Sequence, residues 1–356
     1  MAGVAFLNVL GAVSGALGII QFGLDNFPEP ETTGSSIRIA VGLDFEGGLT
    51  NAGGDAPDIR LWNEAGEFLG IRADPGKVNH GGFIDFKVDH KRDSSQQATY
   101  AVVAGNNNAV CIAYMSITWP DGEKYSWTGD WAELCEPYLE ERAPWYNSNV
   151  LIGGTKHKPR CMWVDKDGNQ PTTGFQVHFP EFVEQTDRTS FTDEEKEDIV
   201  RYTCSNGVPF RTFQEPDPRT VTYRVLNPLL KRDEQAVTVA QSTAPAKRKT
   251  WTPRGTSFST RQETSPIKTM QFNQLVVDDS PDNSAFRLCN SASSLGPDFV
   301  SIPEGMFCRM SDKSLWPLCT EGLIDACFNM DVKQLIIGGV AARASYDEVM
   351  DWGSGN

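Results

Sequence analysis

Aromatic rings beside carboxylates are the residues of this sequence whose types and spacing could do the most specific chemistry. Tryptophans, tyrosines and acids gather between residues 119 and 146. Sugar rings stack on flat apolar surfaces while their hydroxyls bond to acids, so this stretch is typical of a carbohydrate-binding face. The same rings could fill the core of a β-sheet domain, and we favour that interpretation. The candidate carbohydrate-binding residues are Trp119, Trp127, Asp130 and Trp131.

Catalytic motifs are absent from the sequence. It has no G-x-S-x-G nucleophile elbow, no H-E-x-x-H zinc motif, no phosphate-binding loop and no dinucleotide-binding glycine pattern. Its histidines are expected at surface turns or strand ends; they are His80, His90, His157 and His178. A glycosidase needs only two carboxylates at the right separation, but acids are too frequent here to select a pair. We therefore assign no catalytic residue and favour a protein that is not an enzyme.

Metal and cofactor sites are not expected either. The loop at 165–169 begins like a calcium-binding loop, with oxygen-bearing side chains at alternate positions. Gln176 stands where an EF-hand has its bidentate glutamate, so a plain hairpin turn is the simpler interpretation. No two cysteines have C-x-x-C spacing, which also argues against zinc.

The cysteines indicate disulfides and an oxidising compartment. Their even number divides four and four around a long cysteine-free middle, so each half can close two bridges, with three pairings open in each half. The predicted disulfide cysteines are Cys111, Cys135, Cys161, Cys204, Cys289, Cys308, Cys319 and Cys327. We expect an extracellular or secretory-pathway protein, although the sequence has no N-glycosylation acceptor.

Two dibasic pairs are candidate sites of proteolytic processing. They lie in a segment rich in Thr, Ser and Pro, and secretory proteases of the kexin type cut accessible pairs of this kind. Solvated charge on a linker is an equally good interpretation. The pairs are Lys231 with Arg232, and Lys247 with Arg248.

The elements that position these residues begin with an apolar segment at 1–27. Apolar residues at three- and four-residue steps predict a helix, with small residues on another side that allow close packing. Such a helix could contact a membrane or a second copy through Val4, Leu7, Leu10, Gly11, Gly15 and Leu17. The alternative is a signal peptide cleaved at the small residues 14–16, which would leave residues 1–16 out of the mature chain.

The remaining chain reads as a mainly β protein. After a linker at 28–35, short alternating strands over 36–187 predict an antiparallel β-sandwich, with hairpin turns at 63–66, at 120–122 and around Asp167. A short helix follows in 188–210, where Thr192 and Glu195 form a capping box. Residues 211–274 are expected to be a flexible linker, and 275–356 a small, disulfide-linked α+β part.

Four segments of the sequence resemble a group of largely uncharacterised proteins of filamentous ascomycete fungi. They are "GGDAPDIRLWNEAGEFLG", "CIAYMSITWPDGEKYSWTGDW", "KPRCMWVDKDGNQPTTGFQVHFPEF" and "LGPDFVSIPEGMFCRMSDKSLWPLC". The resemblance covers the β-rich part and the C-terminal part and is poor in the middle. It implies a fungal source and a similar two-part layout with a hydrophobic N-terminus, and it transfers no catalytic residue.

Charge limits the partners. The formal net charge of -15 repels nucleic acid and anionic membranes. A second copy, a glycan, or a membrane contacted through apolar burial are the remaining candidates. We predict a non-catalytic protein of the secretory pathway or cell exterior that acts by binding or self-assembly, with a secreted carbohydrate-active protein, lectin or hydrolase, as the alternative.

Overall fold

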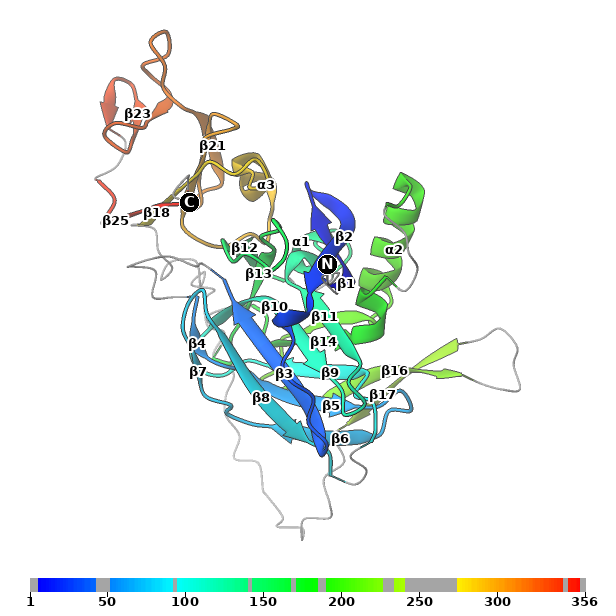
Figure 1. Ribbon diagram of the computed structural model, residues 1–356. Coiled ribbons are helices and arrows are strands. Elements are labelled where there is room, and N and C mark those ends of the chain that lie inside the picture. Colours follow the sequence, from blue (N-terminus) through cyan, green and yellow to red (C-terminus); the bar gives the residue numbers. More distant parts are fainter. Residues whose placement is uncertain are drawn as a thin grey trace, which may run out of the picture.

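The structure is a computed structural model of the 356-residue chain. It describes residues 6–42, 52–91, 95–139, 143–167, 171–184, 190–226, 234–240, 274–341 and 345–352. A large β-sheet body carries a smaller β-rich unit at one end, formed by the C-terminal part of the chain (Figure 1). The prediction of a mainly β protein with antiparallel sheets is confirmed.

Two antiparallel sheets make the body and share one core (Figure 1). The first has the order β12-β13-β10-β3-β8, with β11 paired to β10, and the second has the order β15-β14-β9-β5-β6. The rings of Trp127 on β11 and Phe175 on β14 lie 4.7 Å apart, so the sheets pack face to face. Strands β9, β10, β13 and β14 are buried along their whole length, which explains the apolar runs in β9 and β10; the polar residues of β13 and β14, such as Gln176, are buried with them.

The bounds of the body strands follow. The first sheet contains β3 (Gly34–Val41), β8 (Phe83–Asp89), β10 (Val110–Thr118), β11 (Lys124–Thr128), β12 (Trp145–Asn147) and β13 (Arg160–Val164). The second contains β5 (Asp58–Trp62), β6 (Phe68–Arg72), β9 (Tyr100–Ala104), β14 (Gly174–His178) and β15 (Phe210–Phe213). A short pair beside them is β4 (Gly54–Asp55) with β7 (Lys77–Val78). The body helices are η1 (Leu24–Asn26), α1 (Asp130–Leu134), η2 (Phe179–Phe182) and α2 (Asp193–Ser205).

The N-terminal segment is a β-hairpin, and the predicted helix over 1–27 is wrong. Strands β1 (Phe6–Val13) and β2 (Ala16–Gly23) pair antiparallel around a two-residue turn. Ser14 and Gly15 in that turn have φ of 48° and 85°, the left-handed backbone that a type I′ hairpin turn requires. The apolar spacing predicted a helix because the hairpin buries residues on both faces, and this removes the alternation of apolar and polar residues that marks a strand.

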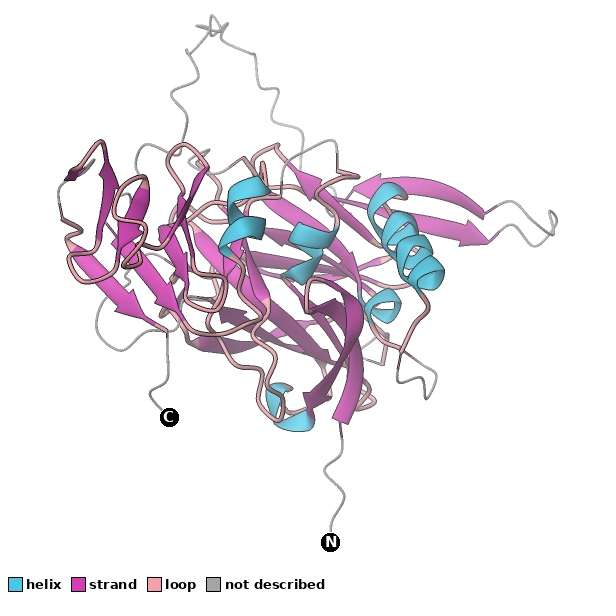
Figure 2. Cartoon of the chain, turned by 90° about the horizontal axis from the view of Figure 1, so that it is seen from above, coloured by secondary structure: helices cyan, strands magenta, loops and turns pink. Residues whose placement is uncertain are grey.

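The segment predicted as a flexible linker contains strands. Residues 210–213 form β15, and β16 (Thr220–Leu226) pairs with β17 (Glu234–Ala240) in a hairpin that extends from the body (Figures 1 and 2). Gln176 anchors it: its amide donates to the carbonyl of Thr222 at 2.7 Å and accepts from the Thr222 N–H at 2.8 Å. The entropy cost of ordering this hairpin is therefore offset by contacts with the body, which the composition of the segment does not reveal. Residues 241–273 lie outside the described residues.

Local signals were read correctly where the contacts are short in sequence. The Thr192–Glu195 capping box starts α2. The turns at 63–66 and 120–122 join β5 to β6 and β10 to β11. The hairpin expected around Asp167 is wrong, because β13 belongs to the first sheet and β14 to the second. The chain crosses between sheets there instead of turning back along one.

All eight cysteines are paired, and each half of the chain closes two bridges, as predicted. The bridges are Cys111–Cys161, Cys135–Cys204, Cys289–Cys308 and Cys319–Cys327. They are consistent with an extracellular or secretory-pathway protein. Within the described ranges, no helix is long and apolar enough to span a bilayer.

The C-terminal unit packs against the end of the body next to β12 and β13. The indole of Trp163 donates to the Leu295 carbonyl at 3.0 Å, and Tyr146 donates through its hydroxyl to the Pro297 carbonyl at 2.9 Å. No disulfide joins the unit to the body, so these contacts hold it. Its elements are β18 (Gln274–Asp278), α3 (Ala285–Asn290), β19 (Asp298–Ser301), β20 (Met306–Arg309), β21 (Ser314–Pro317), β22 (Cys327–Asn329), β23 (Gln334–Ile337), β24 (Val340–Ala341) and β25 (Glu348–Asp351).

Candidate functional site

A fully buried carboxylate lies beneath the N-terminal hairpin. Asp130, the first residue of α1, is 0% exposed. Its Oδ2 accepts from the Thr128 hydroxyl and bonds to His157 Nε2, both at 2.9 Å, and its Oδ1 accepts from the Arg160 backbone N–H at 2.9 Å. Burial acts to raise the pKa of Asp130, but His157 and Arg160 outweigh it and hold that pKa below its usual value. The buried carboxylate therefore fixes the position of the His157 ring.

Two arginines extend this cluster toward the C-terminal unit. Arg160 on β13 donates through Nε to Glu133 Oε2 at 3.0 Å, and Arg287 on α3 donates to Glu133 Oε1 at 2.5 Å. Arg160 also reaches across to the Asn283 side chain and the Asp282 carbonyl, at 3.1 and 3.2 Å. Glu133 is thus shared between a body arginine and a C-terminal arginine, which ties the two parts together at one point.

The hairpin covers the cluster closely. The Trp131 indole donates to the Leu10 carbonyl at 3.0 Å. A Cβ on Gly11 would lie 2.7 Å from Asp130 Oδ2, and one on Gly15 would lie 2.5 Å from the Arg287 guanidinium. Only glycine lets the backbone pass over the charged groups at these two positions.

A groove opens between the hairpin and the loop that carries His157. Its cavity of about 610 Å³ is continued past Val13 by a smaller one of about 140 Å³, and both are lined by Val13, Lys156 and His157. We call this site the hairpin groove. Its larger cavity is lined by Phe6, Asn8, Val13, Ile19, Ile20, Gln21 and residues 154–157. The volume lies in the range of small-molecule sites.

The two walls of the hairpin groove differ in polarity. The hairpin wall is mostly apolar, with Phe6 and Ile19 beside the polar Asn8 and Gln21. Lys156 and His157 belong to the facing loop, whose wall is polar.

The four candidate carbohydrate-binding residues lie in the interior. Trp119, Trp127, Asp130 and Trp131 are between 0% and 2% exposed, so no sugar can stack on them. The three tryptophan rings belong to the hydrophobic core, where the two sheets and the hairpin enclose them. Asp130 belongs to the charge cluster and not to a glycan site.

The N-terminal candidates are part of the fold rather than an outward-facing helix. Leu10 and Leu17 are 5% and 3% exposed, Leu7 is half-buried, and Gly11 and Gly15 pack over the charge cluster. Val4 lies outside the described residues. The same holds for the processing candidates Lys231, Arg232, Lys247 and Arg248.

The sequence singles out Asp130, Gly11 and Gly15 for other roles and does not single out His157, which it places at the surface as an ordinary histidine. The partner of His157, Asp130, is 27 residues away on another element. No short motif marks such a pair. The Ser14-Gly15 turn is different, because a Ser-Gly dipeptide between apolar runs is a recognised turn signal and could have located the hairpin.

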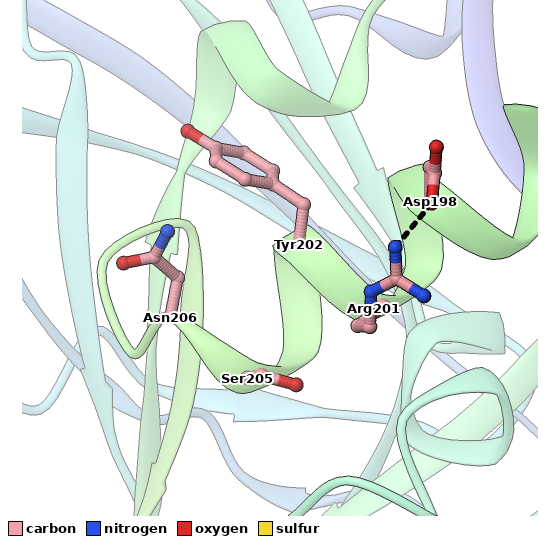
Figure 3. A pocket seen from close by; sticks show the side chains of 5 residues that line it. All are labelled: Asp198, Arg201, Tyr202, Ser205 and Asn206. Atoms are coloured by element: carbon pink, nitrogen blue, oxygen red, sulfur yellow. Dashed lines mark hydrogen bonds and ion pairs between the residues drawn. The ribbon is translucent and has the colours of Figure 1, made fainter.

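A second hollow, of about 460 Å³, follows the exposed side of α2 (Figure 3). Figure 3 shows Arg201 directed at Asp198, with which it forms an ion pair, and Tyr202 directed away from them. The Tyr202 ring is covered by the Arg224 guanidinium at 4.7 Å, and its hydroxyl donates to Glu181 at 3.3 Å. These side chains are engaged with protein partners, so this hollow is a weaker candidate. Within the described residues, no three potential metal ligands gather around a single position.

His178 is a pH-sensitive contact between the second sheet and the loop at 63–66. Its Nε2 bonds to Glu64 at 2.8 Å, and its Nδ1 lies 3.5 Å from Glu181. Burial acts to lower the pKa of His178, but Glu181 and Glu64 outweigh it and raise that pKa above its ordinary 6.5. The bond to His178 in turn lowers the pKa of Glu64 below its ordinary 4.5.

Replacing His178 is therefore expected to cost more stability in mild acid than in base. Because the pKa of His178 is raised in the folded state, protonated His178 contributes stability that is fully present below pH 6.5 and is lost as the pH rises through the folded pKa. Because the pKa of Glu64 is lowered, ionised Glu64 contributes stability above pH 4.5. In urea unfolding, His178→Gln should lower the free energy of unfolding by about 1 kcal/mol more at pH 5.5 than at pH 8.5. His80→Gln is the control, and an equal loss at both pH values would contradict the prediction.

No protein-family model and no curated protein matches this chain. The function must therefore be inferred from the chemistry of the site.

Proposed function

We propose that the protein is a secreted binding protein that holds a small ligand in the hairpin groove. The observation that carries this proposal is the arrangement of the groove: a cavity of about 610 Å³ with a mostly apolar wall facing a polar one, in which His157 is held in place by the fully buried Asp130. Polar groups that are fixed before a ligand arrives are what a specific binding site requires.

The scaffold supports a role outside the reducing cytosol. Two disulfides brace a body whose two packed sheets we classify as a β-sandwich, and two more brace the C-terminal unit. Reduction in the cytosol would remove these crosslinks, so the protein is suited to the extracellular space or the secretory pathway. The fungal source implied by the resemblance is part of the same proposal.

Binding is favoured over hydrolysis because, among the described residues, neither Thr155 nor Ser14 pairs its hydroxyl with the His157 ring as a nucleophile pairs with its base. Thr155 donates through its hydroxyl to the Ile152 carbonyl at 2.9 Å. Ser14 lines the smaller cavity but, among the described residues, makes no hydrogen bond to His157. A secreted carbohydrate-active protein remains the alternative, and a polysaccharide-hydrolysis panel tests it: turnover that is lost in His157→Gln would replace the binding proposal.

The proposal is tested by a thermal-shift screen of the purified full chain against a library of small metabolites. Compounds that stabilise the protein should lose their effect in Phe6→Ser, which removes a ring from the groove wall. Phe286→Ser is the matched control, because Phe6 and Phe286 are 49% and 57% exposed but Phe286 lies on α3. No stabilising compound, or compounds equally affected by both variants, would overturn the proposal. The intact mass of the secreted protein would also report cleavage near residue 16, 232 or 248.

A further inference from the structure

We propose that the ligand of the hairpin groove is a small anionic amphiphile, a carboxylate carrying an alkyl chain. This inference rests on the proposed function, since it names the ligand class of the same site. It follows from three features of the groove: its local positive charge, its exposed apolar side chains and its concave shape.

The positive charge of the groove contrasts with the rest of the protein. The chain has a net charge of -15, yet Lys156, His157 and Lys158 are consecutive and line the smaller cavity together with Arg160 and a single acid, Asp282. Arg160 is bound to Glu133, and Lys158 donates to Asn149 at 2.7 Å. Lys156 is exposed, and the side chain of His157 is 14% exposed. Lys156 is therefore the cation that can receive an anion, and it stands where the two cavities meet, beside His157, whose Nε2 is bonded to Asp130.

The apolar side of the groove offers a place for a chain. Phe6 and Val13 are 49% and 39% exposed, and half-buried Ile19 lies with them along the hairpin. Large apolar side chains left exposed beside a cavity gain free energy when a ligand covers them.

The occupant is a free amphiphile rather than a lipid in a bilayer. A membrane surface is broad, and an anionic one is repelled by a protein of charge -15. The cations here lie inside a hollow between the hairpin and a loop, where a single small molecule can reach them. A carboxylate at Lys156, with its chain toward Phe6, satisfies both walls at once.

The experiment is calorimetric titration of the full chain with sodium decanoate below its micelle concentration. Decyltrimethylammonium supplies the same chain with the opposite charge, and acetate supplies the charge without the chain. We expect decanoate to bind at least tenfold more tightly than either. Equal affinity for decyltrimethylammonium would overturn the preference for an anion. Equal affinity for acetate would show that the alkyl chain does not contribute, and would overturn the proposal of an amphiphilic ligand.

Two pairs of variants locate the binding. Lys156→Glu should weaken decanoate binding about tenfold, and the control Lys77→Glu, whose side chain is 80% exposed on β7, should leave it unchanged. Phe6→Ser should weaken it at least fivefold, and Phe286→Ser should not. Any other pattern places the ligand elsewhere and overturns the inference.

Failure of this inference can be told apart from failure of the proposed function. If decanoate does not bind while compounds from the thermal-shift screen still depend on Phe6, the ligand class is wrong and the binding function stands. Flotation of the intact protein with phosphatidylserine vesicles, in the absence of decanoate binding, would point to a membrane surface and would also overturn the inference.

Discussion

The chain without residues 1–16 is expected to lose most of its stability. The deletion removes β1, in which Val9 and Leu10 are 0% and 5% exposed. Their burial contributes roughly 3–6 kcal/mol, and the Trp131 indole, left without its Leu10 acceptor, costs about 1–3 kcal/mol more. Since a whole domain is stable by only about 5–15 kcal/mol, urea unfolding followed by circular dichroism should show a weak or absent cooperative transition.

The same measurement separates the hairpin from a leader peptide. If residues 1–16 were a cleaved signal, the shortened chain would unfold at the same urea concentration as the full chain. A point variant guards against non-specific effects of truncation. Gly11→Ala places a Cβ 2.7 Å from Asp130 Oδ2 and should cost about 2 kcal/mol, whereas Gly322→Ala meets nothing within 4 Å and should be near neutral.

Removing the Cys135–Cys204 bridge is expected to have the second largest effect. The bridge joins the end of α1 to α2 across a sequence separation of 69 residues. In the loop-entropy model, removing this crosslink raises the conformational entropy of the unfolded chain and so stabilises the unfolded state by about 4 kcal/mol. The double variant Cys135→Ala with Cys204→Ala should therefore lower the free energy of unfolding by that amount. The measurement is urea unfolding under non-reducing conditions.

The short bridge in the C-terminal unit is the matched comparison. Cys319 and Cys327 are separated by 8 residues, so their double alanine variant should lose only about 2.5 kcal/mol. Equal losses in the two double variants would contradict the loop-length argument. Titration of the denatured, unreduced native protein should find no free thiol, and finding eight would contradict the oxidised state altogether.

Sequence reasoning worked where the decisive contacts are local or can be counted. The capping box of α2 joins residues three apart, and the turn at 120–122 is set by its own residue types. The division of the cysteines into two halves follows from their positions, although the pairing within each half does not. The assignment of the tryptophans to the core followed from the density of apolar strands around them.

It failed where burial of both faces hides the periodicity of a strand. The N-terminal hairpin is covered on one side by the body, and its other side lines the groove, so its apolar residues fall at spacings that also fit a helix. The hairpin β16–β17 was missed for a different reason. Its strands, TVTYRVL and EQAVTVA, carry β-branched residues at alternate positions, which is a strand signal, but the flanking sequence rich in Pro, Ser and charge outweighed it. The buried Gln176 side chain that holds the hairpin lies on another element.

By itself, then, the sequence determined the class of the protein: a mainly β, acidic chain with paired cysteines and a short capped helix within 188–210. Only the tertiary structure decided the site. Asp130, His157 and Arg287 come from α1, a loop and α3. The hairpin that covers them begins at Phe6, 124 residues before Asp130. Side chains so far apart in sequence meet only when the packing of sheets, hairpin and C-terminal unit brings their elements together, and no local pattern records that packing.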